Sequence, residues 1–454
     1  MELQIKTKTK SCAGYYYIET FGCQMNEFDS ERLSFILENL NYLKTGRAED
    51  ADLIVINTCA VRKKAENRLF GHIGNLKALK LINPDLIICI GGCAAASLRE
   101  KIIEKFPFVD IVFGTKNLDA LPDLINRKKR LSDGICSIEN SGDIPHDFYS
   151  FKRRFGFKAF LPVMVGCNNH CSYCIVPHVR GSEVSVKPEK IIEAAKMLSN
   201  SGTVEITLLG QNVNSYGNDF NESEKITFAQ LLDKISAIEG LKRIRFMTSH
   251  PKDFSDELIE IIGKHKNLAK HIHLPLQAGS DRILGLMNRK YSRKDYINLY
   301  RKIKTVLPGC SVTTDLIVGF PGETEDDFNR TLDLVGQLRF HRAFTFLYSQ
   351  RKGTAAEKLP DSTKPGEKKA WFSRLTELQN GISLEENKKS VGKIFEVLVE
   401  GSAGKNNGLL EGRLENNTVV NFEGRRELAG KFINVEITDA RSFYLEGKIA
   451  GDNR

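Results

Sequence analysis

Short apolar segments alternate with helical patterns along most of the chain, and this alternation leaves few architectures open. In the N-terminal part, near-continuous apolar runs occupy residues 15–20, 53–58, 86–92 and 110–114. Runs of this kind, separated by segments with helical spacing, indicate a parallel sheet that helices cover on both faces. The sequence therefore predicts an N-terminal parallel α/β domain over residues 1–130.

The first helix of this domain is predicted from its periodicity. Apolar residues recur at helical spacing from Leu33 to Leu40. Asn26 and Ser30 precede them, and both are residue types that cap helices. We therefore expect one of these two residues to cap the helix.

The alternation returns after a polar stretch rich in turn residues, which we interpret as a linker over residues 131–154. Six further strand-and-helix units follow in a second domain, residues 155–385. Because six units are too few for a closed eight-stranded barrel, the expected architecture is a partial (β/α)6 barrel. The predicted strands are residues 160–166, 204–210, 243–249, 271–276, 311–320 and 343–349.

The C-terminal part, residues 390–453, has no helical pattern. Short strand patterns follow one another there, separated by Gly and Asn turns. This pattern is typical of a small β-barrel.

Charge and hydropathy narrow the setting in which the protein works. The formal net charge is +9, and nearly all of the excess falls between residues 147 and 390. A polyanionic partner fits this excess, although a solvated basic face explains it as well. No stretch reaches the roughly 18 apolar residues of a membrane span, and the first residues lack the apolar core of a secretory signal. We therefore expect a cytoplasmic protein that does not bind a membrane.

The strongest motif is Cys167, Cys171 and Cys174, which follows the first strand of the second domain. In a reducing compartment, metal ligation explains such a motif better than disulfides do. Three thiolates so close together can bind one [4Fe–4S] cluster and leave one iron open to a reactant. The alternative is a zinc knuckle with His170 or His178 as fourth ligand, but the second cysteine pair typical of such sites is missing.

Three more cysteines, Cys23, Cys59 and Cys93, are far apart in the sequence but share a topological position. Each comes just after a predicted strand of the N-terminal sheet. Because the carboxyl ends of parallel strands lie along one edge, where open α/β sheets bind ligands, we predict a second three-cysteine cluster with an open iron. The alternative is three buried structural thiols. The cysteines that are not assigned as ligands are Cys12, Cys89, Cys136 and Cys310.

With both cysteine sets in view, the chain resembles the tRNA methylthiotransferases of the radical SAM superfamily, and most of all their MiaB branch. The resemblance covers nearly the whole chain. It is carried by ETFGCQMNEFDSE, NTCAVR, GGCAA, VGCNNHCSYCIVPHVRG, LLGQNVNSYG, RFMTSHP, HLPLQAGSD, TDLIVGFPGET and FLYSQRKGTAA. The C-terminal part resembles a TRAM domain, a small RNA-binding β-barrel.

The resemblance implies roles for particular residues. Gly210 and Gln211, after the second barrel strand, are the candidates for contacts with S-adenosylmethionine (SAM). The superfamily's Gly-Gly-Glu pattern is absent there, and the later SAM-contact pattern is kept only in part around Gly319, because Glu323 falls one place late. Arg180 matches the family pattern and is a candidate for charge interactions near the site. The implied SAM-cluster ligands are Cys167, Cys171 and Cys174, and the implied auxiliary-cluster ligands are Cys23, Cys59 and Cys93.

The activity implied by the resemblance is the conversion of N6-isopentenyladenosine, beside the tRNA anticodon, to its 2-methylthio derivative. Two [4Fe–4S] clusters and SAM are the implied cofactors. The implied partners are the tRNA anticodon stem-loop, an electron donor such as flavodoxin or ferredoxin, and a sulfur donor, with the enzyme acting as a monomer. Two alternatives stay open: a sister methylthiotransferase for threonylcarbamoyl-adenosine or a ribosomal protein, and a non-enzymatic iron–sulfur RNA-binding protein.

Overall fold

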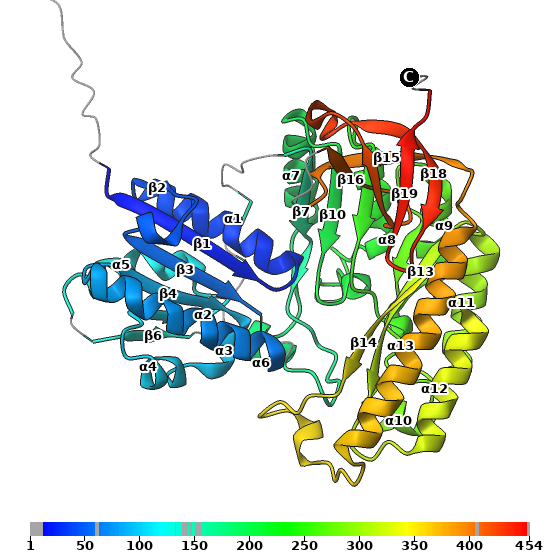
Figure 1. The fold of residues 1–454 in the computed structure, drawn as a ribbon, viewed down its shortest axis with the longest axis horizontal. Helices are drawn as coiled ribbons and strands as arrows, with labels where there is room; N and C mark the ends of the chain where they lie inside the picture. The colour runs from blue at the N-terminus through cyan, green and yellow to red at the C-terminus, as the bar shows by residue number, and fades with distance from the viewer. Residues whose placement is uncertain are drawn as a thin grey trace, which may run out of the picture. The chain divides into compact units, whose positions relative to one another are not determined.

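The computed structural model describes residues 12–59, 63–131, 133–138, 144, 148–149, 156–404 and 408–451. The chain forms two compact units (Figure 1). One contains the N-terminal sheet together with Val165–Asn168 and Ile175–Val184, and the other contains the remainder of the chain. Within the described ranges, no helix is both long and apolar enough to cross a membrane.

A six-stranded parallel sheet with strand order β2-β1-β3-β4-β5-β6 forms the centre of the N-terminal unit. Its strands are β1 (Gly14–Phe21), β2 (Tyr42–Lys44), β3 (Leu53–Thr58), β4 (Ile87–Gly92), β5 (Ile111–Phe113) and β6 (Ile135–Ser137). The helices of this unit are α1 (Gln24–Asn39), α2 (Lys63–Ile82), α3 (Cys93–Leu98), α4 (Lys101–Lys105), α5 (Leu121–Lys128) and α6 (Val176–Arg180). The parallel α/β prediction is confirmed. Strands β2 and β6 were not predicted, and β6 lies inside the stretch interpreted as a linker, most of whose other residues lie outside the described ranges.

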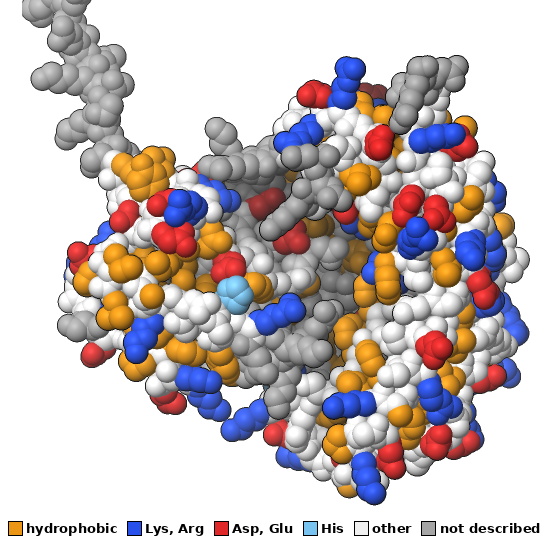
Figure 2. All heavy atoms as spheres, in the orientation of Figure 1, with side chains coloured by type: hydrophobic (Ala, Val, Ile, Leu, Met, Phe, Trp, Pro, Cys, Tyr) orange, Lys and Arg blue, Asp and Glu red, His pale blue; other side chains and the backbone are white. Residues whose placement is uncertain are grey.

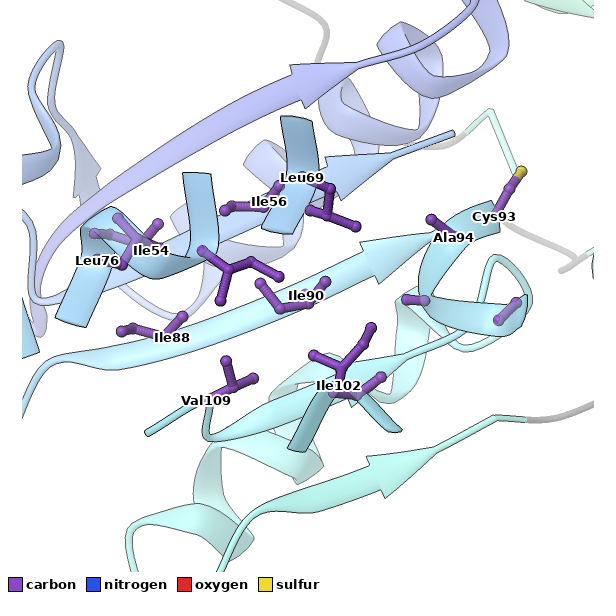
Figure 3. Close-up of a cluster of buried hydrophobic side chains, with 14 of the residues drawn as sticks. Ile54, Ile56, Leu69, Leu76, Ile88, Ile90, Cys93, Ala94, Ile102 and Val109 are labelled. Carbon is purple, nitrogen blue, oxygen red and sulfur yellow. The ribbon is translucent and has the colours of Figure 1, made fainter. Parts of the chain in front are cut away.

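The central strands of this sheet are buried on both faces. Because successive side chains of a strand point to opposite faces, Ile54 and Ile56 of β3 lie in the apolar cluster that includes residues of α2. Leu53 and Val55 lie in the other cluster, which includes residues of α1. Figure 3 shows the first cluster, with Cys93 at the end of β4 and its sulfur directed away from the isoleucines. Continuous burial thus explains why these strands read as uninterrupted apolar runs.

Helix α1 begins at Gln24 with Cys23 as its N-cap residue, so the prediction of a cap at Asn26 or Ser30 was wrong. The Asn26 side chain instead points backward, and its Oδ1 accepts a hydrogen bond from the Cys23 N–H at 3.4 Å. This is the reciprocal half of a capping box. The cysteine that follows β1 is therefore fixed by the start of the helix.

The second unit contains six parallel strands in two three-stranded sheets, β11-β10-β7 and β12-β13-β14. A parallel β-bridge pairs Ile244, in the third of these strands along the chain, with Leu268, which lies just before the fourth. The strands are β7 (Lys158–Pro162), β10 (Glu205–Leu209), β11 (Arg243–Phe246), β12 (His271–His273), β13 (Ser311–Val318) and β14 (Arg342–Leu347). The helices are α7 (Pro188–Asn200), α8 (Phe228–Ser236), α9 (Asp256–Lys264), α10 (Asp281–Leu286), α11 (Arg293–Val306), α12 (Glu325–Leu338) and α13 (Pro365–Lys388). This arrangement confirms the predicted partial barrel.

The C-terminal residues of the same unit form a closed barrel with strand order β15-β16-β17-β19-β18. Its strands are β15 (Ile394–Ser402), β16 (Leu409–Arg413), β17 (Val419–Glu423), β18 (Phe432–Ala440) and β19 (Tyr444–Ile449). Val397, Val420 and Phe422 belong to its buried centre. The small β-barrel predicted from the strand patterns is confirmed.

Two buried arginines of β11 attach this barrel to the rest of its unit. Arg243 and Arg245 donate hydrogen bonds of 2.7–2.9 Å to the backbone carbonyls of residues 413–415. Glu205 of β10 accepts a hydrogen bond from Arg245 Nε at 3.1 Å, which compensates the buried charge. The barrel is therefore held by directional bonds to its backbone.

Charged side chains are mixed on the face of the molecule shown in Figure 2. Lys and Arg alternate there with Asp and Glu and do not gather into one basic surface. This face therefore gives no support, from charge alone, to a single polyanion site.

Candidate metal and cofactor sites

The three N-terminal cysteines follow three strands that are neighbours in the sheet. In the strand register, Phe21 of β1 pairs with Thr58 of β3, and Thr58 pairs with Gly92 of β4. Cys59 and Cys93 directly follow the last two of these positions, and Cys23 follows the first after one glycine. The structure therefore brings the three sequence-predicted cysteines to one edge of the sheet.

Two glycines allow the strand ends to approach each other this closely. A Cβ atom on Gly22 would lie 2.8 Å from the Cys59 Cβ, and one on Gly92 would lie 2.4 Å from the carbonyl oxygen of Thr58. Gly92 also has a φ of +91°, which residues other than glycine rarely adopt. Side chains at these positions would force the strand ends apart.

The thiols at this edge influence each other's ionisation. A hydrogen bond with Cys59 is the main cause that lowers the pKa of Cys23 to about 6, and Arg180 acts in the same direction. Burial raises the pKa of Cys93, an effect that Arg180 opposes. The Arg180 Nε donates a hydrogen bond to the Cys93 sulfur at 3.2 Å. The lowered pKa favours the thiolate of Cys23, the form in which cysteine binds metal. At Cys93 the contact with Arg180 only partly offsets the effect of burial.

The surroundings of this edge fit an iron–sulfur cluster. Asn57 Nδ2 donates to the Asn26 carbonyl at 2.8 Å and to Ser30 Oγ at 2.9 Å, which fixes the α1 residues behind Cys23. Among the described residues, the buried Thr58 hydroxyl next to Cys59 has no hydrogen-bond partner, as expected where a further group belongs. In the described part of the chain, no three ligand side chains converge tightly enough for a single metal ion. A cluster does not need such convergence, because each cysteine binds a different iron.

The loop of Cys171 and Cys174 is anchored by bonds to a distant segment. The Cys174 N–H donates to the Cys171 carbonyl at 3.0 Å, which makes a tight turn between the two. Ser172 donates through its N–H to the Met287 carbonyl and through its hydroxyl to the Leu286 carbonyl. Cys167 belongs to the other compact unit, where its N–H donates to a backbone carbonyl at 3.0 Å. The assignment of the triplet to one cluster therefore rests on its spacing.

Arg289 gives Cys171 a contact like that of Arg180 with Cys93. Its Nη1 donates to the Cys171 sulfur at 3.4 Å, its Nε to the Tyr291 hydroxyl at 2.9 Å and its Nη2 to the Pro275 carbonyl at 3.1 Å. Sequence reasoning did not find Arg289, because 118 residues separate it from Cys171.

The candidates for SAM contacts lie at the carboxyl ends of the barrel strands, the usual ligand face of such barrels. Gly210 follows β10, and a Cβ there would lie 2.7 Å from the Met164 Cγ. Gln211 is partly exposed beside it. Several buried polar atoms near the same strand ends lack a partner within the described residues; they are Asn212 Oδ1, both amide atoms of Asn214, Ser249 Oγ, Tyr348 OH and Ser349 Oγ. Buried polar atoms without partners fit a polar cofactor.

Sequence reasoning missed these polar groups, although a signal was present. Each lies in a short polar run directly after a strand, in GQNVN, TSHP or YSQ. His250 in TSHP has a structural role: its Nδ1 accepts a hydrogen bond from the Lys252 N–H, and burial lowers its pKa to about 2. Glu323 turns into the loop after β13, where it accepts bonds from the N–H groups of Gly319 and Phe320.

The comparisons with known proteins agree with this organisation. Residues 15–114 match Uncharacterized protein family UPF0004, residues 161–335 match the Radical SAM superfamily, and residues 388–450 match the TRAM domain. Among solved structures, the radical SAM methyltransferase TsrM from Kitasatospora setae has a similar fold, with a TM-score of 0.57 at 13% identity over 76% of this chain and 77% of that one.

Curated relatives match over nearly the whole length. A tRNA-2-methylthio-N(6)-dimethylallyladenosine synthase of Clostridium botulinum (strain Okra / Type B1) is 48% identical over 98% of this chain and 99% of its own. The synthase of the same name from Caldicellulosiruptor saccharolyticus is 47% identical, over 96% of this chain and 92% of its own.

The fold and the cysteine sites thus define a radical SAM enzyme with an additional N-terminal cysteine site and a TRAM domain. Within that class, the chain belongs to the tRNA-2-methylthio-N(6)-dimethylallyladenosine synthase family. The resemblance inferred from the sequence motifs is confirmed.

Proposed function

We propose that this protein adds a methylthio group to carbon 2 of N6-isopentenylated adenosine in tRNA, using SAM and two [4Fe–4S] clusters. One observation carries the proposal: Cys23, Cys59 and Cys93 follow neighbouring strands whose ends are in register, in a chain whose barrel also carries the Cys-x3-Cys-x2-Cys triplet. Two three-cysteine sites account for a reaction that needs both a radical and a sulfur.

The protein's own groups have separable tasks in this reaction. The triplet cysteines hold one cluster and the strand-end cysteines hold the other, each with three sulfurs. A cluster bound in this way supplies an open iron, and with SAM it supplies the radical chemistry that attacks an unactivated carbon. Gly210 leaves room beside β10, and the unpartnered polar groups after β10, β11 and β14 orient SAM.

The substrate in this proposal is a tRNA whose target base is unstacked from its neighbours in the anticodon loop. A base inside the anticodon loop cannot reach a buried centre, so it must be splayed out. Arg413, Arg425, Arg426 and Lys431 of the TRAM domain are the candidate contacts with the tRNA backbone. The proposal includes a monomeric, cytoplasmic enzyme that takes electrons from a flavodoxin- or ferredoxin-type donor and sulfur from a separate donor.

The test is anaerobic reconstitution with iron, sulfide, SAM, a reductant and tRNA that carries isopentenyladenosine. Mass spectrometry of digested nucleosides should find the 2-methylthio derivative, and the reaction mixture should contain 5′-deoxyadenosine. A matched tRNA that carries threonylcarbamoyl-adenosine should stay unmodified. Modification of that second tRNA alone would indicate the sister enzyme, and absence of 5′-deoxyadenosine would indicate a binding protein.

A further inference from the structure

The segment that follows the cysteine triplet is part of the N-terminal unit. Helix α6 (Val176–Arg180) follows Cys174 almost directly in the chain. Ile175 and Val179 lie in the same buried cluster as Ala94 and Ala95 of α3. This packing carries Arg180, the last residue of α6, into the interior, where it is 5% exposed.

Arg180 lies between Cys93, one of the three cysteines at the strand ends (the strand-end site), and Asp29 of the helix behind Cys23. Its Nε donates to the Cys93 sulfur at 3.2 Å, and its Nη2 donates to Asp29 Oδ2 at 3.0 Å. Asp29 belongs to α1, the helix that Cys23 caps, and it is as deeply buried as Arg180. The guanidinium is therefore held by hydrogen bonds to both groups, and its bond to Cys93 orients the Cys93 sulfur.

The charges at this position need each other. A buried thiolate or carboxylate without a partner is strongly unfavourable. The guanidinium is charged because arginine is not deprotonated in proteins, and its partners here are the Cys93 sulfur and the Asp29 carboxylate. A cluster bound by three thiolates would bring further negative charge to the same place. The group in contact with the Cys93 sulfur is the guanidinium of Arg180, whereas the Asp29 carboxylate binds the other end of that guanidinium.

We infer that Arg180 is the positioning residue of the auxiliary cluster: it holds the Cys93 sulfur in the ligating orientation and places one positive charge beside the cluster. This inference rests on the proposed assignment of Cys23, Cys59 and Cys93 as auxiliary-cluster ligands. Outer partners that orient metal ligands typically account for about 10- to 100-fold in metal affinity. Loss of the charge disfavours the reduced, more negative cluster, so the midpoint potential becomes more negative.

The test uses the full-length chain with all three triplet cysteines replaced by Ala, so that only the auxiliary cluster is measured. In this background, Arg180→Gln with Asp29→Asn removes the ion pair without leaving a buried charge alone. The matched control is Arg32→Gln with Asp119→Asn. Arg32 is another buried arginine of the same unit, and its Nη2 bonds both carboxylate oxygens of Asp119 at 2.6 and 2.8 Å rather than a sulfur.

Three quantities are measured on each protein: iron and sulfide per chain, the rate of cluster loss to a chelator, and the midpoint potential. The double variant Arg180→Gln with Asp29→Asn (the Arg180 pair) should lose its cluster about 10- to 100-fold faster than the background. Its potential should be more negative, because the charge removed from direct contact with the sulfur is the positive one, while Asp29 binds the guanidinium rather than the sulfur. The Arg32 pair should match the background in both. Arg180→Lys keeps the positive charge but lacks the planar guanidinium. It should therefore keep the midpoint potential of the background while losing the cluster faster. This variant also tests the role of Arg180 if the double variant fails to fold.

Two results would overturn different parts of this scheme. A background protein that binds no iron would overturn the proposed ligand assignment itself. A background protein with a normal cluster, together with an Arg180→Lys variant and an Arg180 pair that retain it as firmly and at the same potential, would overturn the role of Arg180 and leave the proposed function intact.

Discussion

The N-terminal cysteine set depends on a whole sheet, whereas the triplet lies within one short stretch of chain. In the sheet, the ends of β1, β3 and β4 must stay in register for the cysteines to meet. In the triplet, two hydrogen bonds from Ser172 anchor the loop to the carbonyls of Leu286 and Met287. The first site should therefore be sensitive to changes in strand packing, and the second to changes in the residues that anchor its loop.

The two sites also differ in how they compensate buried charge. At the strand ends, Arg180 contacts both a cysteine sulfur and the carboxylate of Asp29. At the triplet, Arg289 contacts the Cys171 sulfur, while its other bonds go to a hydroxyl and a carbonyl. The other partners of Arg289 therefore neutralise its positive charge less than Asp29 neutralises that of Arg180.

The largest expected effect separates the two sites completely. Replacing the three N-terminal cysteines by Ala should leave one cluster per chain, preserve SAM cleavage and abolish methylthiolation. Replacing the three triplet cysteines should abolish SAM cleavage as well, because the radical cannot form. Iron and sulfide analysis, 5′-deoxyadenosine yield and nucleoside mass spectrometry measure these outcomes. Loss of both clusters from either variant would show that the sites are not independent.

Gly92→Ala should damage the strand-end site through the fold alone. A side chain in the positive-φ, extended conformation of Gly92 costs about 1–3 kcal/mol, and overpacking against the Thr58 carbonyl costs about 1–3 kcal/mol. The N-terminal unit should therefore lose about 3 kcal/mol of stability. Urea unfolding with hydrogen exchange of the sheet measures this loss. Gly71→Ala is the control, since Gly71 lies in α2 with open space around its Cβ position. Equal stability of the two variants would contradict the argument.

The pH dependence of stability should reveal a buried carboxylate near the strand ends of the barrel. Burial raises the pKa of Glu323 from 4.5 to about 7 despite its bonds from Gly319 and Phe320. The folded state then holds a proton that the unfolded state has lost, so stability should fall as pH rises through this window, by about 2 kcal/mol between pH 5 and 7. Thermal unfolding across this range, compared with Glu323→Gln, measures it. A variant with the same slope would show that another group titrates.

Arg289→Gln should have the smallest of these effects, confined to the triplet. Without the guanidinium, the Cys171 sulfur loses a charged donor, and SAM cleavage should slow about tenfold, at the lower end for an outer partner of a metal ligand. The auxiliary cluster should keep its iron content. Arg293→Gln is the control, because Arg293 binds Asp333 rather than a sulfur. A slower reaction in both variants would point to general destabilisation of the barrel.

Much of this organisation follows from the sequence for physical reasons. Long buried strands such as β3 read as apolar runs, and the rule for parallel sheets predicted where Cys23, Cys59 and Cys93 would meet. Strands β2 and β6 are each three residues long and carry no periodic signal. The contacts of Arg180 and Arg289 with sulfur join residues 87 and 118 positions apart, so no local pattern contains them.

The burial of Ile175, Val179 and Arg180 in the N-terminal unit has a consequence for synthesis on the ribosome. The nascent sheet cannot complete its interior when its own last strand emerges. It must wait until the segment beyond the triplet has also left the exit tunnel. By then all six proposed ligands have been translated, but the carbonyls of Leu286 and Met287 that anchor the Cys171 loop have not. The strand-end cysteines can therefore come together before the barrel that anchors the triplet is complete.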